Sequence, residues 1–397
     1  MSIQAEASRP AMPSAPNGLN GRTLGSALQA FGQTLIVPIL SILTALIAGA
    51  ILILLAGRDP VAAYQALIDG ALLEPRGLIQ SLLKTSPLIL SGLAVGFAFK
   101  GGLFNIGAQG QLIMGSVAAA WIGATDLGVP IWLHITLAFG AGALIGAIWG
   151  GIPGALKAYY GANEVITTIM FNFIASRVAE WLISNGSTDG RIRPGPLTDP
   201  NSGAVQRSRP VLENARLPVV FDYPPPADPL NVGIFIAVAA AIIVLIIVNR
   251  TTFGFELRMV GQNPNAARYA GVNVPRQTML TMAIAGALAG MAGVIQTLGV
   301  NGYYEANQSL GLGFDSITVS LLAANHPIGI IFSAFLFGAL EQGSTRMQRT
   351  GVAPELVVLV QALILMFIAA PQIIQYIYRV RVGSTGGQRL SSSWGQK

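Results

Sequence analysis

The chain has 397 residues, of which 52% are hydrophobic and 10% are charged, and its formal net charge is +6. Soluble domains carry about 25% charged residues, so this composition excludes an ordinary soluble protein and indicates a membrane protein. The length suits about ten spans of roughly 20 residues each, and the positive charge is typical of basic residues that flank spans on the cytoplasmic side, not of nucleic-acid binding.

The N-terminal part is predicted to be a polar tail followed by two spans. Residues 1–30 are rich in Pro, Ser, Gly and Asn and lack the apolar core and cleavage site of a secretory signal, so we expect a disordered cytoplasmic tail. A transmembrane domain is predicted over residues 31–378, with its first two spans at 34–56 and 81–99.

A polar, glycine-rich break follows the second span. Residues 101–115 read GGLFNIGAQGQLIMG and place Asn105, Gln109 and Gln111 at membrane depth. Polar or non-helical backbone persists there only where it is buried in protein or lines a cavity. The amides could bind hydroxyls or a base edge of a solute, or they could satisfy the broken backbone itself.

Further spans are predicted at residues 112–124, 131–152 and 165–182, and the last of these begins beside an acid. Glu164 is either a functional acid at membrane depth or part of a helix start in which Asn163 is the cap. Thr168 and Asn172 share a face of the same helix and form a polar stripe, which could face a pathway or join two helices. Both alternatives stay open at this point.

Two loops of different character come next. Residues 184–231 form a long, proline-rich loop that we expect outside, and residues 249–278 form a basic cytoplasmic loop, with an apolar span at 233–248 between them. Within the basic loop, Asn263 and Pro264 predict the cap and first residue of a short helix. Such a helix suits docking to a soluble partner or lying on the membrane surface.

The last part of the membrane domain contains a second interruption. A span is predicted at 280–300. Residues 314–340 are interrupted by Asn325-His326-Pro327, so we interpret them as a half-span followed by a full span. A final span at 356–377 and a cytoplasmic tail at 379–397 complete the chain. Two interrupted regions, Phe99 to Gly115 and Gly311 to Pro327, each pair a glycine-rich polar break with an apolar helix, and their matching places in the two halves point to a midplane binding site between repeats. His326 beside Pro327 is read as a turn element, and Arg346 and Arg349 fall outside, against the positive-inside rule.

Enzyme chemistry finds little support. The chain has no cysteine, only the two histidines His134 and His326, no carboxylate dyad and no Gly-x-x-x-x-Gly-Lys-[Ser/Thr] phosphate loop. We therefore expect no catalytic residues, no metal and no cofactor on this chain, and no ATP hydrolysis by it alone.

Several segments closely resemble the permease subunits of ABC-type nucleoside and simple-sugar importers, within the wider superfamily that includes branched-chain amino acid and ribose permeases. They are GLAVGFAFKGGLFNIGAQGQLIMG, ANEVITTIMFNFIA, TTFGFELRMVGQNPNAARYAGV and GFDSITVSLLAANHPIGI. The resemblance implies an all-α polytopic membrane protein of about ten transmembrane helices with broken or half-spans, of the vitamin-B12-importer-like type II fold with inverted repeats.

The resemblance also implies partners and sites. It implies two ATP-binding cassette subunits that carry ATP and Mg²⁺, a second permease subunit, an extracytoplasmic solute-binding protein and a place in the bacterial inner membrane. The substrate pathway would involve Phe104, Asn105, Gln109, Gln111, Glu164, Thr168, Asn172, Asn325 and His326. The contact with the ATPase would involve Arg258, Gly261, Asn263, Pro264, Ala266, Ala267, Arg268, Tyr269 and Gly271.

The solute is predicted to be neutral. No cluster of buried charges is available to bind an ion, and Asn105-Ile106-Gly107 is similar to the nucleoside branch, whereas ribose-type permeases tend to show Asp-Leu-Ser there. Three alternatives remain: an ABC permease for a simple sugar or other small solute, an ion-coupled secondary transporter that would depend on Glu164, and a membrane scaffold without transport.

Overall fold

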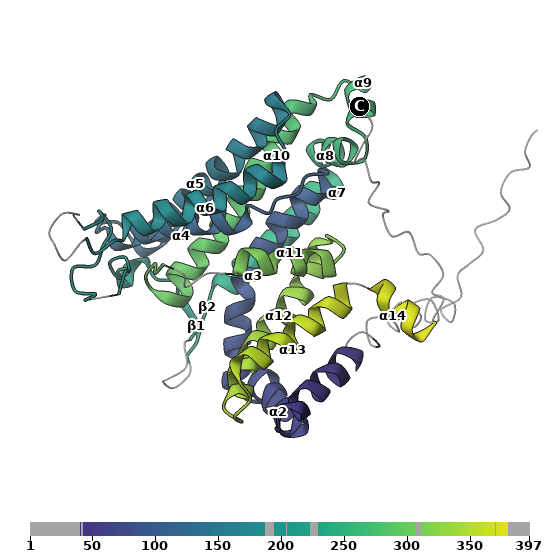
Figure 1. Cartoon of the computed structure of the whole chain (residues 1–397). Helices are drawn as coiled ribbons and strands as arrows, with labels where there is room; N and C mark the ends of the chain where they lie inside the picture. Colours follow the sequence, from purple (N-terminus) through teal and green to yellow (C-terminus); the bar gives the residue numbers. More distant parts are fainter. Residues whose placement is uncertain are drawn as a thin grey trace, which may run out of the picture.

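The chain forms a bundle of helices with a single short sheet in the part described by the computed structural model, which covers residues 40, 43–186, 194–203, 205–222, 229–306, 311–369 and 371–379 (Figure 1). Six described helices are long and apolar enough to cross a membrane. They are α3 (Pro75–Lys100), α5 (Ile131–Tyr160), α6 (Glu164–Leu182), α7 (Gly233–Arg250), α10 with its π-helical extension (Val274–Asn301) and α12 (Pro327–Gln348).

Shorter elements connect or accompany these spans. They are a helix at Leu43–Leu55, α2 (Pro60–Ile68), η1 (Asp69–Leu73), α4 (Ala108–Ala124), η2 (Glu213–Ala215), β1 (Val219–Phe221), β2 (Leu230–Asn231), α8 (Thr252–Gln262), α9 (Pro264–Tyr269), η3 (Gln296–Asn301), α11 (Leu312–Leu322), α13 (Pro354–Ala369) and α14 (Pro371–Tyr378). The predicted all-α polytopic fold is confirmed, and so is the division of residues 314–340 into a short helix and a full one. The predicted tail at 1–30 lies outside the described residues, and so does the predicted tail at 379–397 apart from residue 379.

Helix α3 lies between two groups of helices. On one side it packs against α10, which in turn contacts α4 and α5, and on the other side it packs against α11 and α12. Within the 18-residue apolar stretch of α3, 83% of the residues are buried inside the protein. A span that is surrounded in this way has little contact with lipid. The glycine-rich break continues directly from α3 and therefore starts among the other helices rather than at the periphery of the bundle.

Glycine faces bring α5 and α10 into backbone contact. A Cβ added to Gly146 would overlap the carbonyl oxygen of Gly286, and one added to Gly290 would overlap that of Gly142. Small residues at four-residue spacing permit this approach. Any larger side chain at these positions would push the two helices apart.

Two features differ from the sequence-based expectation. The second span begins at Pro75 rather than near residue 81, and α2 with η1 fills a stretch to which the sequence analysis assigned no element. Both helix starts follow one pattern, in which an acidic N-cap residue, Asp59 or Glu74, precedes a proline at the first helical position. The sequence analysis assigned these prolines no role, although proline is well suited to the first turn of a helix.

The long outer loop is folded onto the bundle in the parts that the structure describes. Its strands β1 and β2 pair antiparallel, and the backbone N–H groups of Val211 and Leu212 donate to the carbonyls of Gly302 (2.8 Å) and Gly123 (2.9 Å). This loop therefore covers the ends of α4 and η3.

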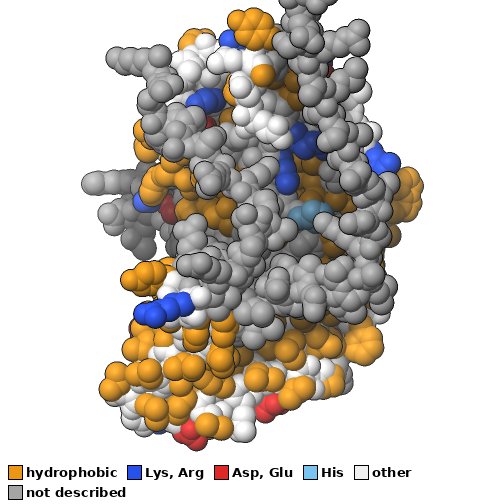
Figure 2. Space-filling view, turned by 90° about the vertical axis from the view of Figure 1, so that its right-hand side faces the viewer, with side chains coloured by type: hydrophobic (Ala, Val, Ile, Leu, Met, Phe, Trp, Pro, Cys, Tyr) orange, Lys and Arg blue, Asp and Glu red, His pale blue; other side chains and the backbone are white. Residues whose placement is uncertain are grey.

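Exposed apolar side chains mark the surface that faces lipid or another subunit. They include Leu54, Leu55, Val61 and Val358, each at least 60% exposed. Figure 2 shows hydrophobic side chains gathered over the lower part of one face, with few charges among them. Monomeric soluble proteins rarely expose a contiguous apolar surface of this extent.

Candidate functional site

Two buried amides close the break that follows α3. Asn105 Nδ2 donates to Gln111 Oε1 at 2.9 Å, and Gln111 Nε2 donates to Asn105 Oδ1 at 3.0 Å. Each residue is 1% exposed. The chain turns at Gly102, where φ is +73°, and helix α4 begins at Ala108. In this conformation the two side chains bond to each other, so they hold the broken segment together.

Asn172 of α6 forms two hydrogen bonds with the backbone of the same break. Its Oδ1 accepts from the backbone N–H of Gly110 at 2.8 Å, and its Nδ2 donates to the carbonyl of Ile106 at 2.9 Å. Thr168, one turn earlier and fully buried, donates to the carbonyl of Glu164 at 2.6 Å. Asn172 therefore joins α6 to the break, whereas the Thr168 hydroxyl bonds within α6, and a role of this stripe in the pathway stays a prediction.

Gln109 connects the break to the second interrupted region. Its Oε1 accepts from the backbone N–H of Gly313 at 2.8 Å, and a Cβ added to Gly313 would overlap the backbone of Gln109. Gln109 is 2% exposed. The two interrupted regions, 99–115 and 311–327, lie in different halves of the chain and therefore meet at this point.

Asn325 and His326 lie elsewhere, in the turn between α11 and α12. Ala324 and Asn325 have left-handed φ values of +49° and +58°, Asn325 Oδ1 accepts from Ser320 Oγ at 3.0 Å, and His326 is the N-cap residue of α12. The turn lies beside Gly96 near the Lys100 end of α3. The interpretation of His326 as a turn element agrees with this geometry, and the turn is not part of the cluster around Gln109.

Glu164 lies at the corner between α5 and α6. Asn163 caps α6, because its Oδ1 accepts from the N–H groups of Val165 (3.0 Å) and Ile166 (3.4 Å). The Glu164 carboxylate is paired with Lys157 Nζ at 2.9 Å, and its side chain is 13% exposed. The cap interpretation is confirmed, and a role for Glu164 in solute contact stays a prediction.

Phe104 is the most exposed of the proposed pathway residues in the break. It is 39% exposed, and its ring meets the ring of Phe99 edge-on, with centroids 4.9 Å apart. The pathway residues therefore separate into a buried amide cluster, a partly exposed aromatic, the α5–α6 corner and the α11–α12 turn.

The basic loop contains the predicted short helix. Asn263 caps α9 through its Oδ1, which accepts from the N–H groups of Asn265 (3.0 Å) and Ala266 (3.1 Å), and Pro264 is its first residue. Ala267 is buried against the protein, whereas Tyr269 is 94% exposed. The chain leaves this exposed end of α9 through Gly271, with φ of +86°. Ala266 and Arg268 are also exposed, so α9 presents most of its surface outward.

Helix α8 connects this surface to the break. A Cβ added to Gly261 would overlap the carbonyl oxygen of Lys100, and one added to Gly102 would lie 3.0 Å from the Gly261 Cα. Gly261, which the resemblance places in the contact with the ATPase, is in backbone contact with the start of the break, and its contact with the ATPase stays a prediction. No local signal could have identified its partner, because the two segments are far apart in the chain.

Arg258 also faces the protein rather than outward. Its Nη1 donates to the carbonyl of Val248 and to Asn249 Oδ1 (3.4 Å), at the last turn of α7. A cation at that position stabilises the negative end of the helix dipole. Arg258 therefore holds α8 against α7, and α9 supplies the outward-facing side chains.

Within the described ranges, no group of three or more His, Asp or Glu side chains could hold a metal ion.

Comparison with known proteins identifies the family. Residues 77–369 match the model of the family described as the permease component of the branched-chain amino acid transport system. The guanosine ABC transporter permease protein NupP of Bacillus subtilis is 40% identical over 345 residues, which cover 86% of this chain and 95% of the relative. The nucleoside ABC transporter permease protein NupB of Lactococcus lactis is 36% identical, with 86% and 93% covered.

A third relative has a different printed solute. The glucose ABC transporter permease protein TsgB13 of Haloferax volcanii is 31% identical, with 87% of this chain and 89% of the relative covered. No solved structure gives a significant match. The family match spans most of the helical bundle, including both interrupted regions and the loop that carries α9, and on this basis the chain belongs to the branched-chain amino acid transport system permease family.

Proposed function

We propose that this chain is the membrane permease subunit of an ATP-driven ABC importer and that its solute is a nucleoside. The two relatives with the highest identity quoted above are named as guanosine and nucleoside permeases, and each is matched over nearly its full length. A simple sugar is the second candidate, favoured by the glucose permease at 31% identity.

The observation that carries the mechanism is the backbone contact between Gly261 and the Lys100–Gly102 turn. Helix α9 offers an exposed surface to a soluble subunit, and α8 joins that surface to the break. Packed backbones cannot move independently without opening a gap or a clash. A movement imposed on α9 by nucleotide binding would therefore reach the break, and through Gln109 it would reach Gly313 and α11.

The chemistry of the break suits a neutral, hydroxyl-rich solute. Amides both donate and accept hydrogen bonds, and the Asn105–Gln111 pair satisfies two such groups without a solute. Separation of the pair in the open state would offer the same groups to ribose hydroxyls or to a base edge. The closed state would then exclude solute without leaving buried polar atoms unsatisfied.

The proposed partners follow from the same mechanism. Two ATP-binding cassette subunits would carry ATP and Mg²⁺ and would bind the α9 surface, a second permease would complete the pathway, and an extracytoplasmic binding protein would deliver the solute. The assembly would lie in the bacterial inner membrane. An ion-coupled mechanism would need a titrating acid in the pathway, and the ion pair of Glu164 with Lys157 gives that carboxylate a structural partner instead.

Solute identity is tested by competition in proteoliposomes that contain the complete transporter. Uptake of labelled guanosine is measured with an excess of unlabelled nucleosides, glucose, ribose or leucine. The proposal expects nucleosides alone to compete. Competition by glucose with no effect of nucleosides would replace the nucleoside with the sugar.

A further inference from the structure

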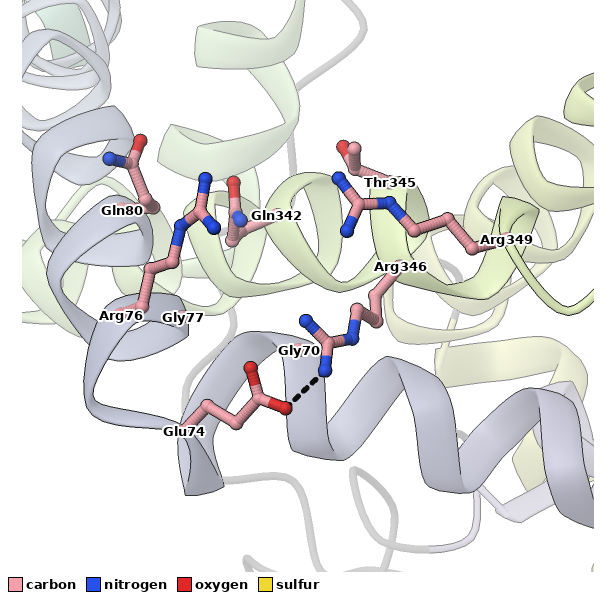
Figure 3. Close-up of a pocket in the computed structure, with 9 residues that line it drawn as sticks. All are labelled: Gly70, Glu74, Arg76, Gly77, Gln80, Gln342, Thr345, Arg346 and Arg349. Atoms are coloured by element: carbon pink, nitrogen blue, oxygen red, sulfur yellow. Dashed lines mark hydrogen bonds and ion pairs between the residues drawn. The ribbon is translucent and has the colours of Figure 1, made fainter. Parts of the chain in front are cut away.

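Three arginines surround a cavity at the end of α3 that is opposite Lys100. The cavity has a volume of about 160 Å³ and lies between the start of α3 and the last turns of α12. Figure 3 shows the guanidinium groups of Arg76, Arg346 and Arg349 directed around one space. The other lining residues are Gly70, Glu74, Gly77, Gln80, Gln342 and Thr345.

The electrostatics of this arginine pocket favour an anion. Of the described lining residues, three are cationic and only Glu74 is anionic, and Glu74 is ion-paired with Arg346. The amides and the hydroxyl of the lining add neutral hydrogen-bond donors. Helix α3 is 26 residues long, and Glu74 at its N-cap makes no side-chain capping bond, so the positive end of a long helix dipole faces the same region.

The location of the pocket is unusual for positive charge. Lys100, at the other end of α3, lies against α8, which belongs to the loop expected on the cytoplasmic side. The pocket is therefore at the extracytoplasmic end of the bundle, where short connections carry few arginines or lysines. Arg346 and Arg349 depart from this rule, and with Arg76 they line one cavity.

Apolar side chains beside the pocket indicate which anion could reach it. Leu72 and Leu73, which immediately precede Glu74, are 43% and 70% exposed. A cationic pocket next to exposed leucines lies at the boundary between polar surface and hydrocarbon, the depth of a lipid headgroup. The guanidinium fork matches a phosphate group through paired hydrogen bonds.

We propose that the arginine pocket binds a phosphate oxyanion, and that a phospholipid headgroup supplies it. The site lies apart from the amide cluster of the break, and the proposal does not depend on the nature of the solute. Basic pockets between membrane helices on the cytoplasmic side bind the head groups of anionic lipids, and the arginine pocket offers the same chemistry at the other end of the bundle.

The test uses the complete transporter in nanodiscs, with the double variant Arg76→Gln/Arg349→Gln. Arg346 is kept, because its ion pair with Glu74 fastens α12 to the turn before α3. Native mass spectrometry measures retained phosphatidylglycerol against phosphatidylcholine. Since hydrogen bonds to charged groups are the strong ones, we expect phosphatidylglycerol binding to fall at least about tenfold in the double variant.

Two controls keep the result specific. Arg209→Gln removes an exposed arginine of the outer loop and is expected to leave lipid retention unchanged. The single variant Arg349→Gln, at an exposed position, is included in case the double variant does not fold, and it is expected to show a smaller loss in the same direction.

Inorganic phosphate, titrated in detergent without added lipid, separates the two sources of the anion. Loss of phosphate binding in the variants without any lipid preference would keep the oxyanion site and assign it a soluble ligand. Unchanged binding of both ligands would overturn the proposal. It would also be overturned if the variants lost only their association with the solute-binding protein, because the pocket would then be a contact for protein carboxylates.

Discussion

Gln109 Oε1 accepts a hydrogen bond from the backbone N–H of Gly313, 204 residues further along the chain, at a distance of 2.8 Å. This bond joins the two places where the helical bundle is interrupted. Because both partners are buried, neither can find water if the other is removed. The bond therefore links stability with the closed arrangement of the break.

Replacement of Gln109 by Met keeps the shape of the side chain and removes the acceptor for Gly313. A buried N–H left without a partner costs about 1–3 kcal/mol, so we expect a lower melting temperature of the detergent-solubilised chain and weaker solute uptake. Gln109→Glu keeps an acceptor oxygen for Gly313 but buries a carboxyl group, so we expect it to lose less than Gln109→Met only at acidic pH, where the carboxyl is protonated. Equal melting temperatures for Gln109→Met and the wild type would show that the bond does not contribute.

Replacement of Asn172 by Leu removes two hydrogen bonds at once, to Gly110 and to Ile106. We expect a destabilisation of about 2–5 kcal/mol, measured by thermal unfolding, because two backbone groups of the break lose their partner. Ser176→Ala, one turn later on the same helix, removes only a bond to the carbonyl of Asn172 and serves as the control. A similar loss in both variants would contradict the role of Asn172 as a clamp.

Replacement of Gly261 by Ala tests the contact between α8 and the break. The added methyl group meets the Lys100 carbonyl, and overpacking of this kind costs about 1–3 kcal/mol. We expect the ATPase subunits still to bind and hydrolyse ATP, while the solute transported per ATP falls by about tenfold. Gly140→Ala, in α5 with nothing within 4 Å of the added Cβ, is the matched control. Normal coupling in Gly261→Ala would exclude this contact as the route of transmission.

Ala324 adopts a left-handed conformation that favours glycine. Its φ is +49°, whereas that of its neighbour Ala323 is −79°. A left-handed residue with a Cβ costs about 1–2 kcal/mol, and part of this is offset by the entropy that glycine loses on folding. Ala324→Gly is therefore expected to stabilise the chain by about 0.5–1 kcal/mol, and Ala323→Gly to destabilise it. The comparison of the two melting temperatures checks the sign.

The environment of Asp199 is expected to make the stability of the outer loop sensitive to acid. A hydrogen bond from the backbone N–H of Asn201, together with the guanidinium of Arg207, holds the pKa of Asp199 below its ordinary value. A depressed pKa contributes stability above the unfolded-state pKa, and this stability is lost as the pH falls through the lowered value. The protection factors of residues 194–209, which are exchange rates corrected for the intrinsic pH dependence of amide exchange, should therefore fall below about pH 4. In Asp199→Asn the protection factors should be low across the pH range, and the wild-type profile in this variant would assign the acid response to other groups.

Local chemistry in the sequence was sufficient to place the helix starts that define the site. Asn163 and Asn263 each precede a helix and cap it in the structure, because a cap depends only on residues within one turn. The positions of the two interruptions were also predictable, since glycines and amides stand out in an apolar sequence. The helix starts at Pro60 and Pro75 were not predicted, because charged residues interrupt the apolar pattern around them.

The partners of the buried amides could not be predicted in the same way. Nothing near Gln109 in the sequence indicates Gly313, and nothing near Gly261 indicates Lys100, because each contact depends on how whole helices pack. The amide pair Asn105–Gln111 is local by comparison, and the sequence offered its self-satisfied arrangement as one of two alternatives. Sequence alone located the unusual residues, and the tertiary structure determined what each one bonds.

The most direct test of the account is uphill solute uptake by proteoliposomes with and without the ATP-binding cassette subunits and their ATP. The account predicts accumulation only when both are present together with the binding protein, and no change when an uncoupler dissipates the ion gradients. Accumulation by this chain alone, or uptake that an uncoupler abolishes while ATP remains, would contradict it.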